Sequence, residues 1–159
     1  MGIEAEIGVL LAEQGLTLAT AESSTGGLVA HRINSVSGSS EYYLGGVVTY
    51  TNEAKEALLG VRHETLVAHG AVSEETALEM AHGARGRFGA DVGIATTGIA
   101  GPTGGTPEKP VGLVYVALSA ADAQCCERHV WHGDRATNNQ QSAEAVLRLV
   151  LSYVQKRSG

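Results

Sequence analysis

Hydroxyl side chains and glycines are concentrated in the segment Thr20–Gly27, which has the sequence TAESSTGG. A serine whose proton is taken by a neighbouring base becomes a nucleophile toward carbonyl and amide carbons. The segment falls between a predicted strand and a predicted helix, where α/β proteins bind ligands and where free backbone N–H groups favour a phosphate or an oxyanion. Serine and threonine are also ordinary helix caps, and glycine permits a tight turn, so the local sequence leaves both interpretations open.

A second glycine-rich segment, Thr96–Pro110, is long for a connection without secondary structure. Strongly apolar segments flank it, so we expect both of its ends to be anchored. Its glycines allow backbone N–H groups to approach a ligand closely. A flexible surface loop is the alternative interpretation.

The chain has only three lysines: Lys55, Lys109 and Lys156. A lysine made neutral by burial or by nearby positive charge can act as the base for a serine. Lys55 follows a predicted strand, and the phenol of Tyr50 is close enough in sequence to relay a proton or orient the amine. Lys109 ends the second glycine-rich segment and is the rival base, whereas a solvated helix position is the plain alternative for Lys55.

The remaining polar residues give weaker indications. Arg135 follows a predicted strand and opens a helix, where it can pair with a phosphate, although an arginine at such a place is more often exposed. The six histidines lack a cysteine or paired-carboxylate context, so we expect neither a metal site nor a cofactor. The dinucleotide-binding glycine fingerprint, the phosphate-binding loop of nucleoside triphosphatases, HExxH and GxSxG are absent.

Composition and charge exclude several classes of protein. With 43% hydrophobic and 18% charged residues and no linker, the 159 residues predict one domain over residues 1–159. A net charge of −6 argues against a nucleic-acid partner, and no apolar run approaches the ~18 residues of a membrane span. The acidic N-terminus does not resemble a signal peptide and the two cysteines are adjacent, so we expect a cytosolic protein without a membrane partner.

Hydrophobic periodicity and cap residues predict about five strands and five helices to position these candidates. Strands are expected over 16–21, 47–51, 91–97, 111–118 and 125–132, and helices over 2–14, after Gly27, over 53–59 with Asn52 as cap, from Ser73 to Phe88, and after Asp134. His63 and His69 are expected to flank a loop. The mixture of elements predicts an α/β fold with helices on both faces of one sheet, and the close succession of the last two strands predicts that they are antiparallel.

Six segments together resemble the CinA C-terminal-domain family, in the family's order and spacing over nearly the whole chain. They are Ala21–Gly27 (AESSTGG), Gly46–Lys55 (GVVTYTNEAK), Gly70–Ser73 (GAVS), Thr97–Pro102 (TGIAGP) with the following glycine pair, Lys109–Gly112 (KPVG) and Gly133–Arg135 (GDR). This family includes stand-alone nicotinamide-mononucleotide amidohydrolases. The resemblance implies a three-layer α/β/α sandwich with a mixed, roughly five-stranded sheet, similar to the anticodon-binding-domain fold.

The resemblance also implies an activity: hydrolysis of the carboxamide of nicotinamide mononucleotide to nicotinate mononucleotide and ammonia, in pyridine-nucleotide recycling and without a metal. It makes Ser23, rather than Ser24, the nucleophile, and Tyr50 and Lys55 the other catalytic residues. We expect Lys55 to take the serine proton with Tyr50 bridging, and backbone N–H groups of 23–27 or 97–101 to hold the oxyanion. The residues expected to bind the substrate are Ser24, Thr25, Gly26, Gly27, Thr97, Gly98, Ile99, Gly101 and Arg135.

Two alternatives stand beside this activity: a non-catalytic nucleotide-sensing or regulatory domain that keeps the pocket, and an amidase for a different small amide. Full-length CinA proteins carry a further N-terminal domain. Because this chain begins at the helix before the AES motif, we expect it to lack that domain and the pyrophosphatase activity that goes with it. Family members are often assemblies, so a homo-oligomer is compatible with the sequence.

Overall fold

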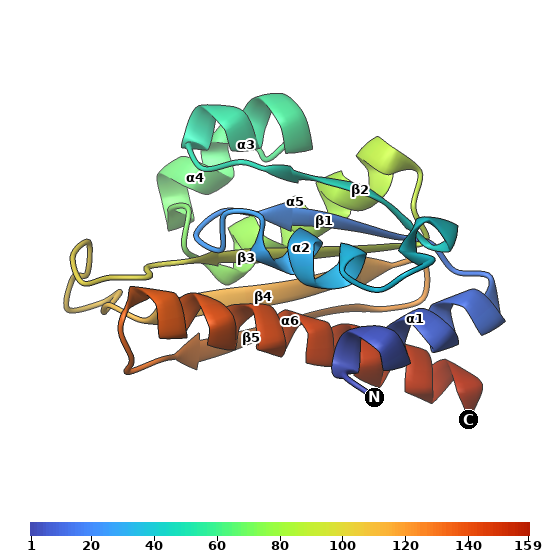
Figure 1. Cartoon of the computed structure of the whole chain (residues 1–159). Coiled ribbons are helices and arrows are strands. Elements are labelled where there is room, and N and C mark those ends of the chain that lie inside the picture. The colour runs from blue at the N-terminus through green and yellow to red at the C-terminus, as the bar shows by residue number, and fades with distance from the viewer.

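The computed structural model describes residues 1–159, which form six α-helices, one 3-10 helix and five strands (Figure 1). The helices are α1 (Ile3–Gln14), α2 (Leu28–Asn34), η1 (Ser39–Glu41), α3 (Asn52–Leu59), α4 (His63–His69), α5 (Glu74–Phe88) and α6 (Arg135–Ser158). The strands are β1 (Leu18–Glu22), β2 (Tyr43–Val48), β3 (Val92–Gly98), β4 (Leu113–Ala120) and β5 (Gln124–Val130).

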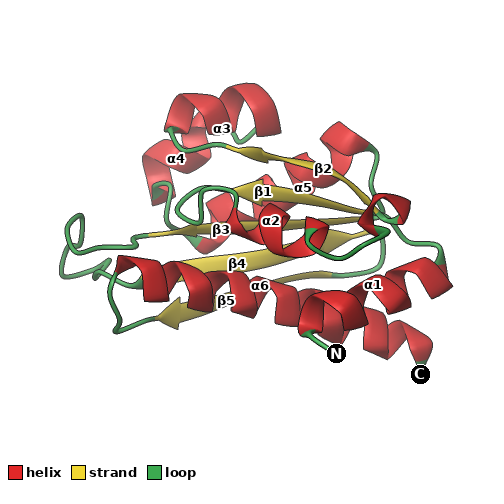
Figure 2. Ribbon diagram, viewed as in Figure 1, coloured by secondary structure: helices red, strands yellow, loops and turns green.

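The strands form one mixed sheet in the order β2-β1-β3-β4-β5. β1 pairs in parallel with β2 and β3, whereas β4 is antiparallel to β3 and to β5, as predicted for the last two strands. The carboxyl ends of β1, β2, β3 and β5 therefore lie at the same end of the sheet (Figure 2). Ligands bind at this end of open α/β sheets, and the topology brings both glycine-rich segments there.

The sheet separates two hydrophobic cores, which confirms the predicted three layers. Successive residues of β1 point to opposite faces: Leu18 joins the core formed with α1, α2 and α6, and Ala19 joins the core formed with α3, α4 and α5. Small residues line the second face. A Cβ on Gly93 would lie 2.1 Å from the carbonyl oxygen of Ala81, so the missing side chain lets α5 lie close to the sheet.

Several helix ends are where the sequence predicts them. Gly15 ends α1 in the left-handed conformation, and the side chains of Ser73 and Asp134 cap α5 and α6 by accepting a hydrogen bond from a backbone N–H in the first turn. The predicted cap of α3 was wrong by one residue. Thr51 is the cap, and Asn52 is the first residue of the helix.

β2 begins at Tyr43, four residues before the predicted start, and ends at Val48 because the chain turns there toward the cap of α3. The glycine pair before Val47, which the predicted strand left out, belongs to the strand. A Cβ on Gly46 would lie 1.9 Å from Oγ1 of Thr20 on β1, so glycine is needed for the close approach of the two strands.

The segment between His63 and His69 is a helix, α4, and not the expected loop, which makes six α-helices instead of five. Only Thr65 and Leu66 of its seven residues are buried, so its hydrophobic pattern is too short to show a period. The boundaries of the remaining strands differ from the predicted ones by one to two residues. No helix is both long and apolar enough to cross a membrane.

Candidate active site

A cavity of about 320 Å³ lies at the carboxyl ends of the parallel strands and the start of α6. It collects side chains and backbone from segments that follow β1, β2 and β3, and from the first turn of α6. Nine of the residues selected from the sequence line it: Ser23, Ser24, Tyr50, Lys55, Thr97, Gly98, Ile99, Gly101 and Arg135.

Ser23 and Lys55 are in direct contact in this cavity. The Lys55 ammonium donates a hydrogen bond to Ser23 Oγ at 3.0 Å and another to the Thr49 carbonyl oxygen at 2.7 Å. Both side chains are buried, and Lys55 forms no ion pair with a carboxylate. Burial without a counter-charge lowers the pKa of Lys55 to about 8. The amine can therefore exchange a proton with the serine near neutral pH.

The depth of Lys55 follows from how α3 packs. Leu59 is buried against α5, and a Cβ on Gly83 of α5 would lie 2.0 Å from the Leu59 carbonyl oxygen. This close contact is possible only with glycine at position 83. Lys55, one helical turn before Leu59, thereby faces inward and its long side chain reaches the end of β1.

Tyr50 is at the rim of the cavity and not between Ser23 and Lys55. Its side chain is 62% exposed, and its hydroxyl accepts a hydrogen bond from Arg135 at 3.2 Å. Only the Tyr50 carbonyl oxygen approaches the Lys55 amine, at 3.5 Å. The expected bridging phenol is therefore not part of the serine–lysine contact, which is direct.

Arg135 and Asn138 hold the glycine-rich segment after β3 against α6. Arg135 donates to the Gly101 carbonyl oxygen at 2.9 Å, and the buried Asn138 donates to the Ala100 carbonyl oxygen at 3.0 Å. Asn138 also accepts a hydrogen bond from the Gly133 amide. Sequence reasoning missed Asn138, because an asparagine four residues into a helix gives no local signal of a distant partner.

The sequence suggested that the backbone N–H groups at the start of α2 are free to bind a ligand, but they are occupied. The buried carboxylate of Glu22 accepts hydrogen bonds from the backbone N–H groups of Gly27, Val29 and Ala30, at the start of α2. The Thr25 hydroxyl also donates to Glu22. Three predicted substrate-binding residues, Thr25, Gly26 and Gly27, thus do not line the cavity.

Free backbone amides remain at two places in the site. The N–H of Ser24, directly after the serine that contacts lysine, donates no hydrogen bond within the chain, and neither do those of Ala100 and Gly101. All three residues line the cavity. Unpaired N–H groups of this kind are suited to stabilise an oxyanion or a phosphate.

Lys109, the rival base, lies elsewhere. Its amine donates to the His69 carbonyl oxygen and lines a separate hollow with Cys126 and Arg128. No contact connects it with Ser23. Of the two lysines left open by the sequence, only Lys55 is placed beside the serine.

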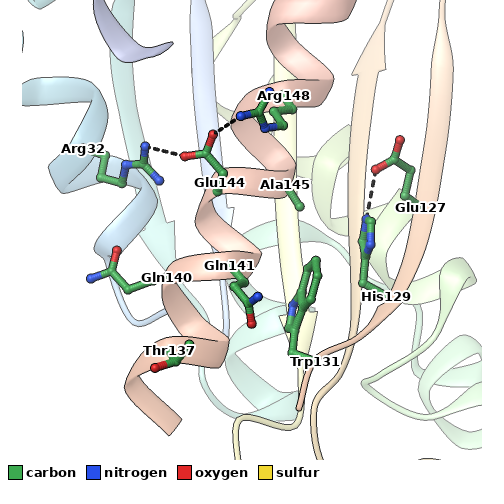
Figure 3. A pocket seen from close by; sticks show the side chains of 10 residues that line it. All are labelled: Arg32, Glu127, His129, Trp131, Thr137, Gln140, Gln141, Glu144, Ala145 and Arg148. Atoms are coloured by element: carbon green, nitrogen blue, oxygen red, sulfur yellow. Dashed lines mark hydrogen bonds and ion pairs between the residues drawn. The ribbon is translucent and has the colours of Figure 1, made fainter. Parts of the chain in front are cut away.

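A hollow of about 830 Å³, larger than the cavity around Ser23 and Lys55, lies between α6 and β5 (Figure 3). Several of its polar side chains pair with one another: Glu144 binds both Arg32 and Arg148, and Glu127 binds His129. No serine, cysteine or lysine lines it. Of these two, the 320 Å³ cavity is the one that holds a serine in contact with a lysine.

Comparison with known proteins gives consistent matches along the chain. Residues 1–154 match the model of the CinA C-terminal domain. A CinA-like protein of Salinibacter ruber is 51% identical over 145 residues, which cover 91% of this chain and 35% of that protein. A CinA-like protein of Chloroherpeton thalassium is 51% identical over 154 residues, covering 94% and 37%. The chain thus spans about a third of the length of these curated relatives.

Solved structures match over almost the full length of both chains. A CinA superfamily protein from Klebsiella pneumoniae superposes with a TM-score of 0.93 at 34% identity, covering 97% of this chain and 96% of the other. The competence/damage-inducible protein CihA from Agrobacterium tumefaciens superposes with a TM-score of 0.86 at 41% identity, covering 96% of each chain. Fold and sequence agree, and the chain belongs to the CinA C-terminal domain family.

Proposed function

We propose that the chain is a serine amidohydrolase that converts nicotinamide mononucleotide to nicotinate mononucleotide and ammonia. The observation that supports this most directly is the 3.0 Å contact between Ser23 Oγ and the amine of Lys55, which is buried and forms no ion pair. Family membership and the resemblance to the amidohydrolases within that family supply the substrate.

In the proposed reaction, neutral Lys55 takes the proton of Ser23 as Oγ bonds to the carboxamide carbon. The tetrahedral oxyanion accepts hydrogen bonds from free amides such as that of Ser24. The C–N bond then breaks, and the proton on Lys55 goes to the departing nitrogen, which leaves as ammonia. Water repeats the sequence on the ester, with Lys55 again as base, and restores Ser23.

The cavity suits a small anionic ligand. Its volume of about 320 Å³ is at the lower end of the usual ~300–1,000 Å³ for small-molecule sites. Arg135 uses two of its five N–H groups in hydrogen bonds to Gly101 and Tyr50 and is otherwise exposed. Its remaining donors are proposed to bind the phosphate. The reaction as written needs no metal.

The first test is ammonia release from nicotinamide mononucleotide in the presence of a chelator. We expect turnover by the wild type and by Ser24→Ala, and a loss of at least about 10³-fold in Ser23→Ala, because only Ser23 contacts the base. Circular dichroism and thermal unfolding check that the variants fold. Equal loss in both variants would contradict the assignment of Ser23, and calorimetric binding of the nucleotide without ammonia release would favour the nucleotide-sensing alternative.

A further inference from the structure

Glu22, the last residue of β1, is a buried carboxylate next to the proposed nucleophile. It is 1% exposed and has no cationic partner. Its Oε1 accepts hydrogen bonds from the Thr25 hydroxyl at 2.6 Å and from the amides of Gly27 and Val29 at 3.2 and 2.9 Å. Its Oε2 accepts from the Ala30 amide at 3.1 Å. Four donors and the positive end of α2 thus compensate one buried negative charge.

This arrangement replaces the usual helix cap. The N-cap residue of α2 is Gly27, which has no side chain to accept a hydrogen bond. A carboxylate from the preceding strand takes that role instead, and the chain between strand and helix is thereby closed into a tight turn. Ser23 and Ser24 lie within that turn.

The turn is also tied to β3. The only proton of the Thr25 hydroxyl goes to Glu22, so the Thr96 hydroxyl, 2.7 Å away, donates to Thr25. The Ser23 amide donates to the Thr96 carbonyl oxygen. The amides of Ser23 and Gly27 are therefore both occupied, whereas that of Ser24, between them, stays free and lines the cavity.

We propose that Glu22 is a positioning residue, which holds the turn so that the Ser24 amide stabilises the oxyanion formed when Ser23 attacks. The inference rests on the proposed amidohydrolase function. An amide directly after the nucleophile is a common oxyanion donor in serine hydrolases, and its direction is set entirely by the backbone. The partner that fixes this backbone is the Glu22 carboxylate, which does not itself line the cavity.

The test is Glu22→Gln. Glutamine keeps the shape, but its NH₂ group faces the Ala30 amide with a donor where the carboxylate has an acceptor. We expect kcat to fall at least about tenfold while KM changes less than about twofold, because the donor matters mainly in the transition state. The matched control is Asp91→Asn. Asp91 accepts from the amide and hydroxyl of Thr17 at the opposite end of the same strands, and its variant should keep kcat within about twofold.

A second pair of variants keeps the inference testable if Glu22→Gln does not fold. Thr96→Val removes the hydroxyl that donates to Thr25, and Thr96→Ser restores it. We expect kcat to fall in the first and to recover in the second. Unchanged kcat in Glu22→Gln, or a loss no larger than the loss of folded protein measured by circular dichroism, would overturn the inference.

A fluorophosphonate probe separates failure of this inference from failure of the proposed function. Ser23 Oγ bonds to the phosphorus of the probe, fluoride leaves, and Lys55 takes the serine proton. The mass of the intact protein then measures the rate of labelling, which depends on the nucleophile and the oxyanion donors and needs no amide substrate. If the wild type releases no ammonia but is labelled, the proposed substrate is wrong, and slower labelling of Glu22→Gln still supports the positioning role. Equal labelling rates would contradict that role, and no labelling of the wild type would overturn both proposals.

Discussion

Lys55 shows how a single residue acquires chemistry from its surroundings. In water its amine is protonated until about pH 10.4, but burial without a carboxylate lowers its pKa to about 8. Two hydrogen-bond acceptors, Ser23 Oγ and the Thr49 carbonyl oxygen, keep the amine in place. The site thus combines a lysine that can be neutral with the hydroxyl that must lose a proton.

The pH dependence of turnover follows from this pKa. Only neutral Lys55 can accept the Ser23 proton, so kcat/KM should rise with pH and level off above about 8, the pKa of Lys55. Below that pH we expect a slope of about one decade per pH unit. The measurement is the initial rate of ammonia release between pH 5.5 and 9.5 in buffers of constant ionic strength.

A profile that is flat from pH 6 to 9 would contradict the assignment of Lys55 as the base. Lys109→Met serves as the control, because that side chain contacts His69 and not the serine. Its profile should match that of the wild type.

At the scale of the element, the contact between α3 and α5 sets the position of Lys55, the proposed base. Gly83 lies where a side chain would strike the Leu59 carbonyl oxygen, at 2.0 Å from the added Cβ. Gly86, one turn further along α5, has no neighbour within 4 Å of such a Cβ. The two glycines are in one helix and differ only in what they face.

We therefore expect opposite effects of the same substitution. Gly83→Ala should push α3 outward, lower the free energy of unfolding by about 1–3 kcal/mol and reduce kcat, because Lys55 moves with the helix. Gly86→Ala should raise the free energy of unfolding by about 0.5–1 kcal/mol and leave kcat unchanged, since alanine favours helix. Urea denaturation and ammonia release measure the two effects. Equal stability of the two variants would show that α3 can adjust without cost.

At the scale of the whole molecule, a buried base costs stability. The fold favours neutral Lys55, whereas the unfolded chain leaves its pKa near 10.5, so the unfolded state binds more protons between pH 8 and 10.5. The contribution of Lys55 to the free energy of unfolding is therefore most favourable above about pH 10.5. It is lost as the pH falls through about 8, where the buried amine becomes protonated. The proposed role of Lys55 as a base at neutral pH thus works against the stability of the fold.

Lys55→Met should reveal the pH-dependent contribution of Lys55 to the free energy of unfolding, because methionine has no charge to bury. Relative to this variant, the wild type should gain up to about 3 kcal/mol in free energy of unfolding as the pH rises from 7 to 10.5, since each pKa unit corresponds to about 1.4 kcal/mol. Lys156→Met, at an exposed position, is the control and should show no such trend. The measurement is urea denaturation across that pH range, and a constant difference between wild type and Lys55→Met would contradict burial of the charge.

The sequence was informative where the determinants are local. Gly15, Ser73 and Asp134 mark helix ends by their own chemistry, and the closely spaced last strands had to be antiparallel. It failed where a residue serves a partner far along the chain. Gly46 lies outside the predicted strand because its reason is Thr20 on the neighbouring strand, and α4 has too few buried residues to show a period.

The same limit applies to the candidate site. The motifs selected Ser23 and Lys55, but their direct contact depends on how α3 packs on α5, and Tyr50 instead contacts Arg135 of α6. The α2 amides seemed free because nothing in the local sequence shows that Glu22 reaches them. Residue types indicated the chemistry, and tertiary packing decided which groups face each other.

The pairing of the first helix with the last has a consequence for biosynthesis. α1 packs along α6, with the Gln14 side chain donating to the Val154 carbonyl oxygen, and both termini lie on the same side of the molecule (Figure 1). Of the elements described, α6 is synthesised last. Until then the apolar stripe of α1 lacks the part of its core that α6 supplies, and the glycine-rich segment lacks Arg135 and Asn138. The cavity is therefore complete only once α6 has been synthesised. Until then α1 exposes the part of its apolar stripe that α6 covers, which is a surface that chaperones bind.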